Sequence, residues 1–366
     1  MTVSELQQFH QSSGARFQPI DGVEVVANYG DVAAEYAALR GTVGLMDLSF
    51  RSRLCLGGAD RTRFLHGQVT NEVNKLKPGQ GCYAALVTAK GKVESDFNIY
   101  RLPNELLLDF EPGLAARVTE RFDKFIIADD VQIVDVSVDY GLLSVQGPRA
   151  AELIARFAPE LRAPVDPLSL VAANDVRGEW YCMRISRAGT SGFDLFLPSG
   201  AIVSSAEALL QGARELGGRL FGWDALEIAR IEAGIPRFGQ DMDETNLASE
   251  AGIEQRAISY EKGCYIGQEV ISRIRAFGQV AKALRGLRLA AGQGLPEKGA
   301  KIFGADKEVG YVTSATHSPT LQVNIALGYV RKEHNAIGTE VMVQIGVERV
   351  PAEIVALPFV PEAMPA

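Results

Sequence analysis

The sequence predicts an α+β fold that ends in a small β-barrel. Helical and strand patterns alternate along the first three quarters of the chain, and short turns join the strands, as in antiparallel sheets. After Arg275 the pattern changes to strands and glycine turns with little helix. A chain of 366 residues is long enough for two or three domains at roughly 150 residues each.

The first elements have clear start and stop signals. Residues 31–40 predict a helix, because Asp31 suits the N-terminal cap and Gly41 lies where a C-terminal cap glycine belongs. Residues 51–56 alternate like a strand. Residues 61–66 predict a short helix that stops at Gly67.

The next stretch predicts a β-meander followed by a helix. Strand patterns over residues 81–110 are interrupted by turn sequences at Ala89 to Gly91 and at Pro103-Asn104. Pro112 opens a predicted helix to about Phe125, and residues 131–138 alternate again. We therefore expect residues 51–139 to form a compact, inserted α+β domain.

A larger unit continues on both sides of this insertion. It contains a strand at 142–147, a helix from Pro148, a hairpin of 182–187 with 193–197, and helices near 200–215 and 223–233. Strand patterns at 309–313, 325–330 and 340–345 predict the barrel. The expected domains are therefore 1–50 plus 140–275, 51–139, and 276–366.

Composition narrows the classes of partner and site. The net charge of −8 argues against nucleic-acid binding, which needs a cationic surface. No stretch has the ~18 apolar residues of a membrane span and no signal peptide is visible, so a cytoplasmic protein is expected.

The four cysteines (55, 82, 182, 264) and four histidines are scattered, which predicts neither a disulfide framework nor a metal site. The acidic run Asp241 to Glu244 lacks the ligand spacing of a calcium loop and predicts a solvated turn.

The run Lys262-Gly263-Cys264-Tyr265-Ile266-Gly267-Gln268-Glu269 is the most distinctive motif. Glycines on both sides of Cys264 permit a tight turn, and a neighbouring lysine favours the thiolate form. Gln268 and Glu269 predict the start of a helix, on which Glu269 and Arg273 are i,i+4 partners. A reactive cysteine is one interpretation. The alternative is a buried, inert cysteine between turn glycines.

This motif resembles the signature of the YgfZ-type family, which is linked to folate-dependent assembly or repair of iron–sulfur proteins. The segments Phe64 to Asn71 and Arg230 to Pro236 resemble the same family. The resemblance covers nearly the whole chain. It implies Cys264 and Lys262 as candidate catalytic residues, with Gly263, Tyr265, Gly267, Gln268, Glu269 and Arg273 as motif support.

Other segments are similar to the T-protein of the glycine cleavage system, an aminomethyltransferase of the same superfamily. They are Val145 to Pro148, Gly239 to Thr245, and Ser318 to Leu321 leading into Ile325 to Leu327. The resemblance implies three domains around a central hole that holds tetrahydrofolate or a one-carbon derivative.

The resemblance also implies Tyr83, Asp194 and Arg230 as folate-binding residues. Each has a structural alternative. Tyr83 would be strand packing, Asp194 an exposed strand residue, and Arg230 a partner of Glu227 or Glu232. A folate ligand needs a carboxylate for its amidine edge, flat apolar walls and cations for its glutamyl tail.

Departures from the T-protein pattern bear on the chemistry. The segment Gly91 to Asp96 has Ser95 where the T-protein pattern has its catalytic aspartate, and keeps only the second acid, Asp96, as a candidate catalytic group. Thr190 replaces a glutamate, and Phe50 replaces a histidine. These changes predict that the folate frame is kept and aminomethyl transfer is lost.

Three hypotheses follow. The first is a folate-dependent accessory protein for iron–sulfur cluster assembly or maintenance, with iron–sulfur client or scaffold proteins as partners. The second is an enzyme, a tetrahydrofolate-dependent aminomethyltransferase. The third is a binding module that holds a different ligand, or none.

Overall fold

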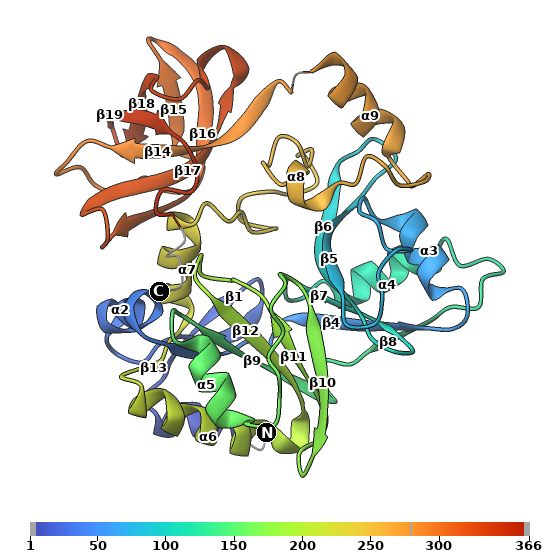
Figure 1. Cartoon of the computed structure of the whole chain (residues 1–366). Helices are drawn as coiled ribbons and strands as arrows, with labels where there is room; N and C mark the ends of the chain where they lie inside the picture. Colours follow the sequence, from blue (N-terminus) through green and yellow to red (C-terminus); the bar gives the residue numbers. More distant parts are fainter. Residues whose placement is uncertain (1–4, 279, 362–366) are drawn as a thin grey trace.

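The computed structural model describes residues 5–278 and 280–361. Figure 1 shows three lobes around a central space, with a closed barrel, a five-stranded sheet and a six-stranded sheet as their centres. The predicted α+β fold with a C-terminal barrel is therefore confirmed. No helix of the described residues is both long and apolar enough to cross a bilayer.

The six-stranded sheet has the order β10-β11-β12-β9-β3-β13. Its strands are β3 (Gly44–Asp47), β9 (Tyr140–Gln146), β10 (Leu170–Asp175), β11 (Gly178–Arg184), β12 (Gly192–Pro198) and β13 (Arg219–Leu220). All neighbours are antiparallel except β13 and β3. The predicted hairpin is confirmed as β11 and β12, whereas the short strands β3, β10 and β13 were not predicted.

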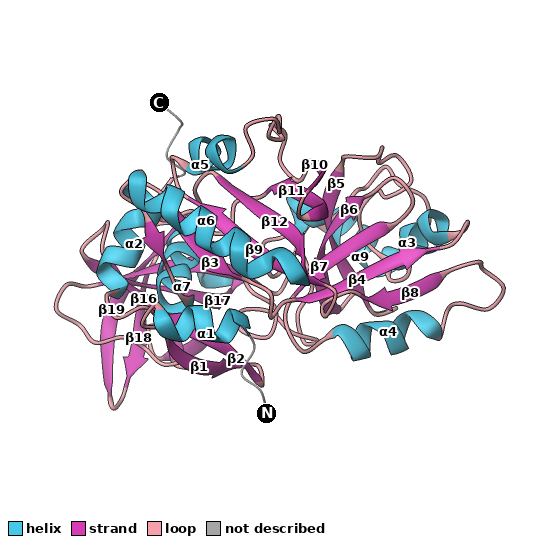
Figure 2. Ribbon diagram, turned by 90° about the horizontal axis from the view of Figure 1, so that it is seen from below, coloured by secondary structure: helices cyan, strands magenta, loops and turns pink. Residues whose placement is uncertain are grey.

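Helices cover both faces of this sheet. Helices α5 (Ala150–Phe157) and α6 (Ile202–Glu215) pack on one face, and α2 (Val32–Gly41) and α7 (Trp223–Glu232) pack on the other. Figure 2 shows α6 running across the sheet. Asp31 caps α2 as predicted, with its carboxylate accepting from the Ala34 amide at 3.0 Å. Gly41 lies inside the last turn of the helix, and Thr42 takes the cap position.

The five-stranded sheet has the order β5-β6-β7-β4-β8 and is antiparallel throughout. It consists of β4 (Ser52–Gly57), β5 (Gly81–Val87), β6 (Val93–Arg101), β7 (Leu106–Phe110) and β8 (Gln132–Asp135). The predicted meander and both of its turns are present. Helix α3 (Arg61–Gln68) includes Gly67 and ends one residue later, where Val69 is extended. Helix α4 (Ala115–Asp123) begins three residues after Pro112.

The remaining elements frame these units. The N-terminal part contributes α1 (Glu5–Ser12) and the hairpin β1 (Arg16–Ile20) with β2 (Val23–Asn28). Short helices α8 (Glu254–Ala257), η1 (Ser199–Ala201) and η2 (Lys332–His334) lie in connections, and α9 (Gln268–Phe277) precedes the barrel. The segment 238–271 packs on β5 and β6, with Phe238, Met242 and Ile271 in one apolar cluster with Val87 and Val93.

The barrel closes in the order β14-β17-β16-β15-β18-β19. Its strands are β14 (Lys282–Leu289), β15 (Lys301–Gly304), β16 (Lys307–Ser318), β17 (Val323–Arg331), β18 (Glu340–Ile345) and β19 (Glu348–Val355). One side rests on α7, where Ile231 joins Leu284, Ile325 and Leu327 in an apolar cluster. The chain after β19 returns to the centre, where the Val360 amide donates to the Glu232 carbonyl at 3.1 Å.

Candidate functional site

A cavity of about 690 Å³ occupies the centre of the molecule, where the two sheets, α7 and the C-terminal segment meet. Its apolar wall includes Leu48, Leu168, Ile185, Trp223 and Leu226, and Pro358 and Val360 close one side. Its charged lining consists of three acids, Asp96, Glu111 and Glu227, and six arginines, Arg51, Arg184, Arg187, Arg230, Arg237 and Arg256. This size and mixture suit an elongated organic ligand with polar ends.

Tyr83 and Asp96 lie together on the wall formed by β5 and β6. The Tyr83 hydroxyl donates to the Asp96 Oδ2 atom at 2.7 Å. The other oxygen, Oδ1, is buried and has no partner among the described residues. Burial, and then the charge of Glu111, raise the pKa of Asp96 to about 6, against the smaller lowering effect of the Tyr83 hydrogen bond. Asp96 is thus a carboxylate that can exchange a proton near neutral pH.

Ser95 faces away from this cavity. It is fully buried, and its hydroxyl has no hydrogen-bond partner among the described residues. Strand β6 alternates, so Asp96 and Asn98 face the cavity while Ser95 and Phe97 face the core of the lobe. The side chain that the cavity receives from this segment is therefore that of Asp96 and not that of Ser95.

Asp194 is placed differently from the prediction. It is 1% exposed, does not line the cavity, and is paired with Arg187, whose Nε donates to Oδ2 at 2.8 Å. Arg187 lies between it and the cavity, so neither a folate contact nor an exposed strand position fits. Thr190 is also buried, and its hydroxyl has no hydrogen-bond partner in the described part of the chain.

Arg230 lies in the wall, but its hydrogen-bonding capacity is used by the protein. Its guanidinium donates to Glu227, Asp241, the Ile235 carbonyl and Ser314, which accounts for its five N–H groups. The predicted direct folate contact therefore lacks a free donor. Arg230 instead ties α7 to the barrel.

Asp241 is the acceptor at the centre of that contact. It is 1% exposed and accepts from Arg230, from the Arg237 amide and from the hydroxyls of Thr313 and Ser314. The solvated turn predicted for Asp241 to Glu244 is thus wrong at its first two residues, because partners distant in sequence bury Asp241 and Met242 packs in an apolar cluster.

A buried ion-pair network that the sequence analysis missed supports the cavity. Asp109 on β7 accepts from Arg51 at 2.7 Å and from Arg187 at 2.6 Å. Although burial alone would raise the pKa of Asp109, the two guanidiniums hold it well below its usual range. Arg51 also pairs with Glu111 at 2.6 Å. The only sequence signal was the acidic pair Asp109 and Glu111 at the end of an apolar strand.

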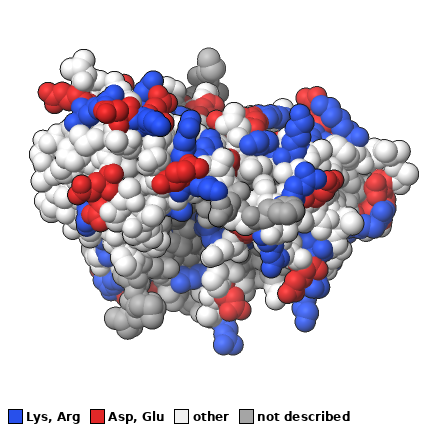
Figure 3. All heavy atoms as spheres, turned by 90° about the horizontal axis from the view of Figure 1, so that it is seen from above, with Lys and Arg blue, Asp and Glu red and all other residues white. Residues whose placement is uncertain are grey.

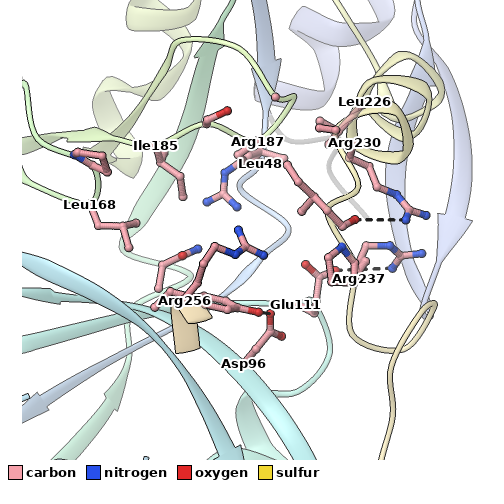
Figure 4. A pocket seen from close by; sticks show the side chains of 18 of the residues that line it. Leu48, Asp96, Glu111, Leu168, Ile185, Arg187, Leu226, Arg230, Arg237 and Arg256 are labelled. Carbon is pink, nitrogen blue, oxygen red and sulfur yellow. Dashed lines mark hydrogen bonds and ion pairs between the residues drawn. The ribbon is translucent and has the colours of Figure 1, made fainter. Parts of the chain in front are cut away.

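Figure 4 shows how the charged groups are arranged. Arg187 and Arg256 point into the cavity from opposite walls, and Asp96, Glu111 and Arg237 follow along it towards Arg230. Arg256 lies over the ring of Tyr83, with its guanidinium carbon 5.2 Å from the ring centroid.

The motif at 262–269 lies outside the cavity wall. None of its residues lines the cavity, and it packs on the C-terminal end of α3. The Lys262 ammonium donates to the carbonyls of His66 and Val69, both at 2.6 Å, and the Ile266 amide donates to Gly67 at 3.2 Å. A cation at this position suits the negative end of a helix.

Lys262 is therefore directed at α3, contrary to its predicted role of tuning Cys264. Lys262 is 6% exposed, whereas Cys264 is exposed. Burial lowers the pKa of Lys262 to about 8, against a smaller raising effect of Glu72. The thiol that Lys262 influences is Cys82 on β5, whose pKa burial raises to about 12 against the lowering effect of Lys262. Cys82 lines the cavity, so Lys262 lies behind the cavity wall.

The other motif residues have structural contacts. Tyr265 is buried in the apolar cluster on β5 and β6, and a side chain on Gly267 would lie 2.5 Å from the Thr88 carbonyl oxygen. Gln268 begins α9, and the predicted pair of Glu269 with Arg273 is present at 2.7 Å. Cys264 and Gly263 remain exposed.

The surface shows no concentration of one charge on the face seen in Figure 3. Lys and Arg side chains are spread over it among Asp and Glu. Among the described residues, no group of three or more His, Cys, Asp or Glu side chains is arranged to hold a metal ion.

Comparison with known proteins identifies relatives over nearly the whole chain. The family model described as the GCVT N-terminal domain matches residues 6–262, and the glycine cleavage T-protein C-terminal barrel domain matches residues 282–361. A protein named aminomethyltransferase from Symbiobacterium thermophilum is 30% identical over 97% of this chain and 96% of its own. Another of that name, from Rubrobacter xylanophilus, is 31% identical over 97% and 93%.

A solved structure shares the fold. It is described as the glycine cleavage system aminomethyltransferase T from Bartonella henselae, and it has a TM-score of 0.87 and 25% identity over 97% of both chains.

Proposed function

Since the chain belongs to the glycine cleavage T-protein family, we propose that its central cavity binds tetrahydrofolate and that Asp96 supports transfer of an aminomethyl-derived one-carbon unit to it. The observation that carries this proposal is the Tyr83–Asp96 pair on the cavity wall. It offers a carboxylate with one free oxygen to a bound ligand.

The chemistry of the wall fits a folate. Flat apolar surfaces such as Trp223, Leu48 and Leu226 suit a ring system, and buried carboxylate oxygens suit its N–H groups. Two carboxylate oxygens of the cavity wall lack a hydrogen-bond partner among the described residues, Asp96 Oδ1 and Glu111 Oε2, and the second lies 3.6 Å from the Arg237 guanidinium. Buried acceptors of this kind are costly unless a ligand or water donates to them.

Asp96 has the properties that the reaction needs from the protein. Tetrahydrofolate, when bound, supplies the amine that accepts the one-carbon unit. With a pKa of about 6, Asp96 is mostly ionised at neutral pH and can stabilise or accept a proton there. Tyr83 keeps the carboxylate oriented through its hydroxyl, and Arg51 adds positive charge nearby.

This order reverses that of the sequence-based hypotheses. The sequence favours the iron–sulfur hypothesis through the motif at Lys262 to Glu269, and Ser95 is its argument against the enzyme. Since Asp96 faces the cavity and the named relatives are aminomethyltransferases, the enzyme becomes the better supported candidate.

The test combines binding with turnover. Calorimetric titration with tetrahydrofolate should give saturable binding to the wild type and to Asp96→Asn. Turnover with an aminomethylated carrier protein should fall at least about a hundredfold in Asp96→Asn, as for loss of a general acid–base group. Ser95→Ala is the matched control, because its side chain faces the core.

Turnover by Asp96→Asn at the wild-type rate would refute the role of Asp96. Absence of tetrahydrofolate binding would refute the folate site and leave a module for another ligand.

A second candidate is a folate-dependent accessory role in iron–sulfur cluster assembly or maintenance. The observation that favours it is the exposed thiol of Cys264. Contacts of Lys262 with α3 and of Tyr265 with β5 and β6 fix the chain on both sides of this cysteine. A thiol so placed can meet an iron–sulfur client or scaffold protein at the surface. Cys264→Ala should then fail to restore cluster-enzyme activity in a deletion strain, while Cys182→Ala, a buried control, should restore it.

A further inference from the structure

Two carboxyl groups of the cavity are arranged in the same way. Asp96 has one oxygen in a hydrogen bond with the Tyr83 hydroxyl at 2.7 Å. Glu111, which follows β7, has one oxygen 2.6 Å from the Arg51 guanidinium. The second oxygen of each group is buried and accepts no hydrogen bond from any residue that the structure describes. Each acid is thus held by one oxygen and leaves the other without a partner.

Glu111 is the neighbour of Asp96 along the cavity, as Figure 4 shows. After burial, the charge of Glu111 is the main cause that raises the pKa of Asp96 to about 6. The other titratable or charged groups that face Asp96 are Tyr83 from β5, Arg51 from the residue before β4, and Arg256 from α8. The Tyr83 hydrogen bond and both guanidiniums lower this pKa, so Glu111 acts against them.

The two acids differ in the groups that hold them. Tyr83 is a neutral hydroxyl donor, whereas Arg51 is a guanidinium that is always charged. A second guanidinium, that of Arg237, lies 3.6 Å from the other oxygen of Glu111. Since cations surround Glu111 and a neutral donor holds Asp96, an exchangeable proton of this pair belongs on Asp96.

Contacts on the far side of Arg51 fix Glu111 in this position. The Arg51 Nε atom donates to Asp109 at 2.7 Å, and Asp109 also accepts from Arg187 at 2.6 Å. Arg51 is thereby anchored in the wall of the cavity. The carboxylate of Glu111, which is 9% exposed, is held by this anchored group and so keeps its place beside Asp96.

We propose that Glu111 is a positioning residue of the transfer reaction, whose fixed negative charge keeps Asp96 ready to hold a proton. The inference rests on the proposed folate function and deepens it. An amine that attacks a carbon atom loses a proton, and an amine that leaves gains one. A carboxyl that exchanges a proton close to neutral pH serves both events, and Glu111 supports them through Asp96 without touching the reacting atoms.

The first measurement is the pH dependence of turnover with tetrahydrofolate and an aminomethylated carrier protein. The variant Glu111→Gln keeps an acceptor for Arg51 and removes the negative charge. The limb of the profile that titrates with Asp96 should move to lower pH by about one unit, because the ionised Asp96 no longer meets a like charge. Glu111→Asp keeps the charge and should return most of the way to the wild-type midpoint.

Glu227→Gln is the matched control. Glu227 is also an acid of the cavity wall and also lies 3.6 Å from Arg237, but its main partner is Arg230. Whatever its rate, this variant should keep the wild-type midpoint. A shift of equal size in Glu227→Gln would show that the overall charge of the cavity sets the midpoint, and would overturn the inference.

The second measurement needs no ligand. The gain in unfolding free energy from Asp96→Asn is measured in urea at pH 4.5 and pH 8, in the wild type and in Glu111→Gln. The growth of this gain with pH should fall to about half or less in the Glu111→Gln background, since the folded Asp96 then ionises at lower pH.

Equal growth in both backgrounds, or an unchanged turnover midpoint in Glu111→Gln, would overturn the role of Glu111 and leave the folate function intact. Failure of the wild type to bind tetrahydrofolate would remove the folate function and the role of Glu111 in transfer. The urea measurements would then still decide whether the two acids interact.

Discussion

Replacement of Asp96 by Asn should stabilise the protein relative to the wild type. This gain in the free energy of unfolding should be larger at neutral pH than at acid pH. Folding raises the pKa of this carboxyl from 3.8 to about 6. The folded state therefore disfavours the charged carboxylate by roughly 3 kcal/mol. Asn retains an acceptor for the Tyr83 hydroxyl but cannot ionise, so the variant avoids this cost.

The sign follows from proton binding. Between pH 4 and 6 the folded wild type holds a proton that the unfolded chain has lost, so its stability falls as pH rises. Below pH 4 both states are protonated, and the advantage of the variant disappears. The difference in unfolding free energy between Asp96→Asn and wild type should grow by about 2 kcal/mol from pH 4.5 to 8.

Urea unfolding at the two pH values, followed by tryptophan fluorescence, measures this difference. Asp109→Asn is the control, because the pKa of Asp109 is held low by Arg187 and Arg51. Its loss should cost almost the same stability at pH 8 and at pH 4.5, since above pH 4 this carboxyl is largely ionised in the folded and the unfolded state. An advantage of Asp96→Asn that is the same at both pH values would show that Asp96 titrates normally and would refute the reasoning.

Three further outcomes are expected. Ellman's reagent should label Cys264 rapidly in the native protein, since the thiol is exposed; undiminished fast labelling in Cys264→Ser would contradict this. Gly267→Ala should destabilise the protein more than Gly278→Ala in urea unfolding. Both glycines have positive φ, but only Gly267 has a backbone oxygen 2.5 Å from the new Cβ, so equal losses would argue against the contact. Arg230→Met should cost about 3–5 kcal/mol, because a buried aspartate loses its partner, and a loss below 1 kcal/mol in the same assay would show that the pair is dispensable.

Periodicity and turn residues predicted most of the fold. The meander of β5 to β7 and the hairpin of β11 with β12 follow from alternation between turn sequences. The short strand β13 has only two residues. Such a pattern carries no periodic signal, and the strand exists because its neighbour β3 is already in place.

For the site, the sequence predicted only which side chains lie on the same face of a strand. Tyr83 and Asp96 are diagonal neighbours on one face of β5 and β6, and alternation alone puts Asp96 and Ser95 on opposite faces. Which face meets the cavity depends on how the lobes pack, and that is not encoded in the strand itself. The pairing of Asp194 with Arg187 likewise depends on a loop conformation.

The motif at 262–269 shows that closeness in sequence does not predict which groups are in contact. Lys262 is two residues from Cys264 in sequence, which favoured an electrostatic pair, yet its ammonium reaches the carbonyls of α3. The charge that Lys262 buries therefore fixes the segment to α3. Cys264 is exposed in the same segment. The two proposed sites are therefore separate: Asp96 lies inside the cavity, where the protein provides its environment, and Cys264 lies at the surface.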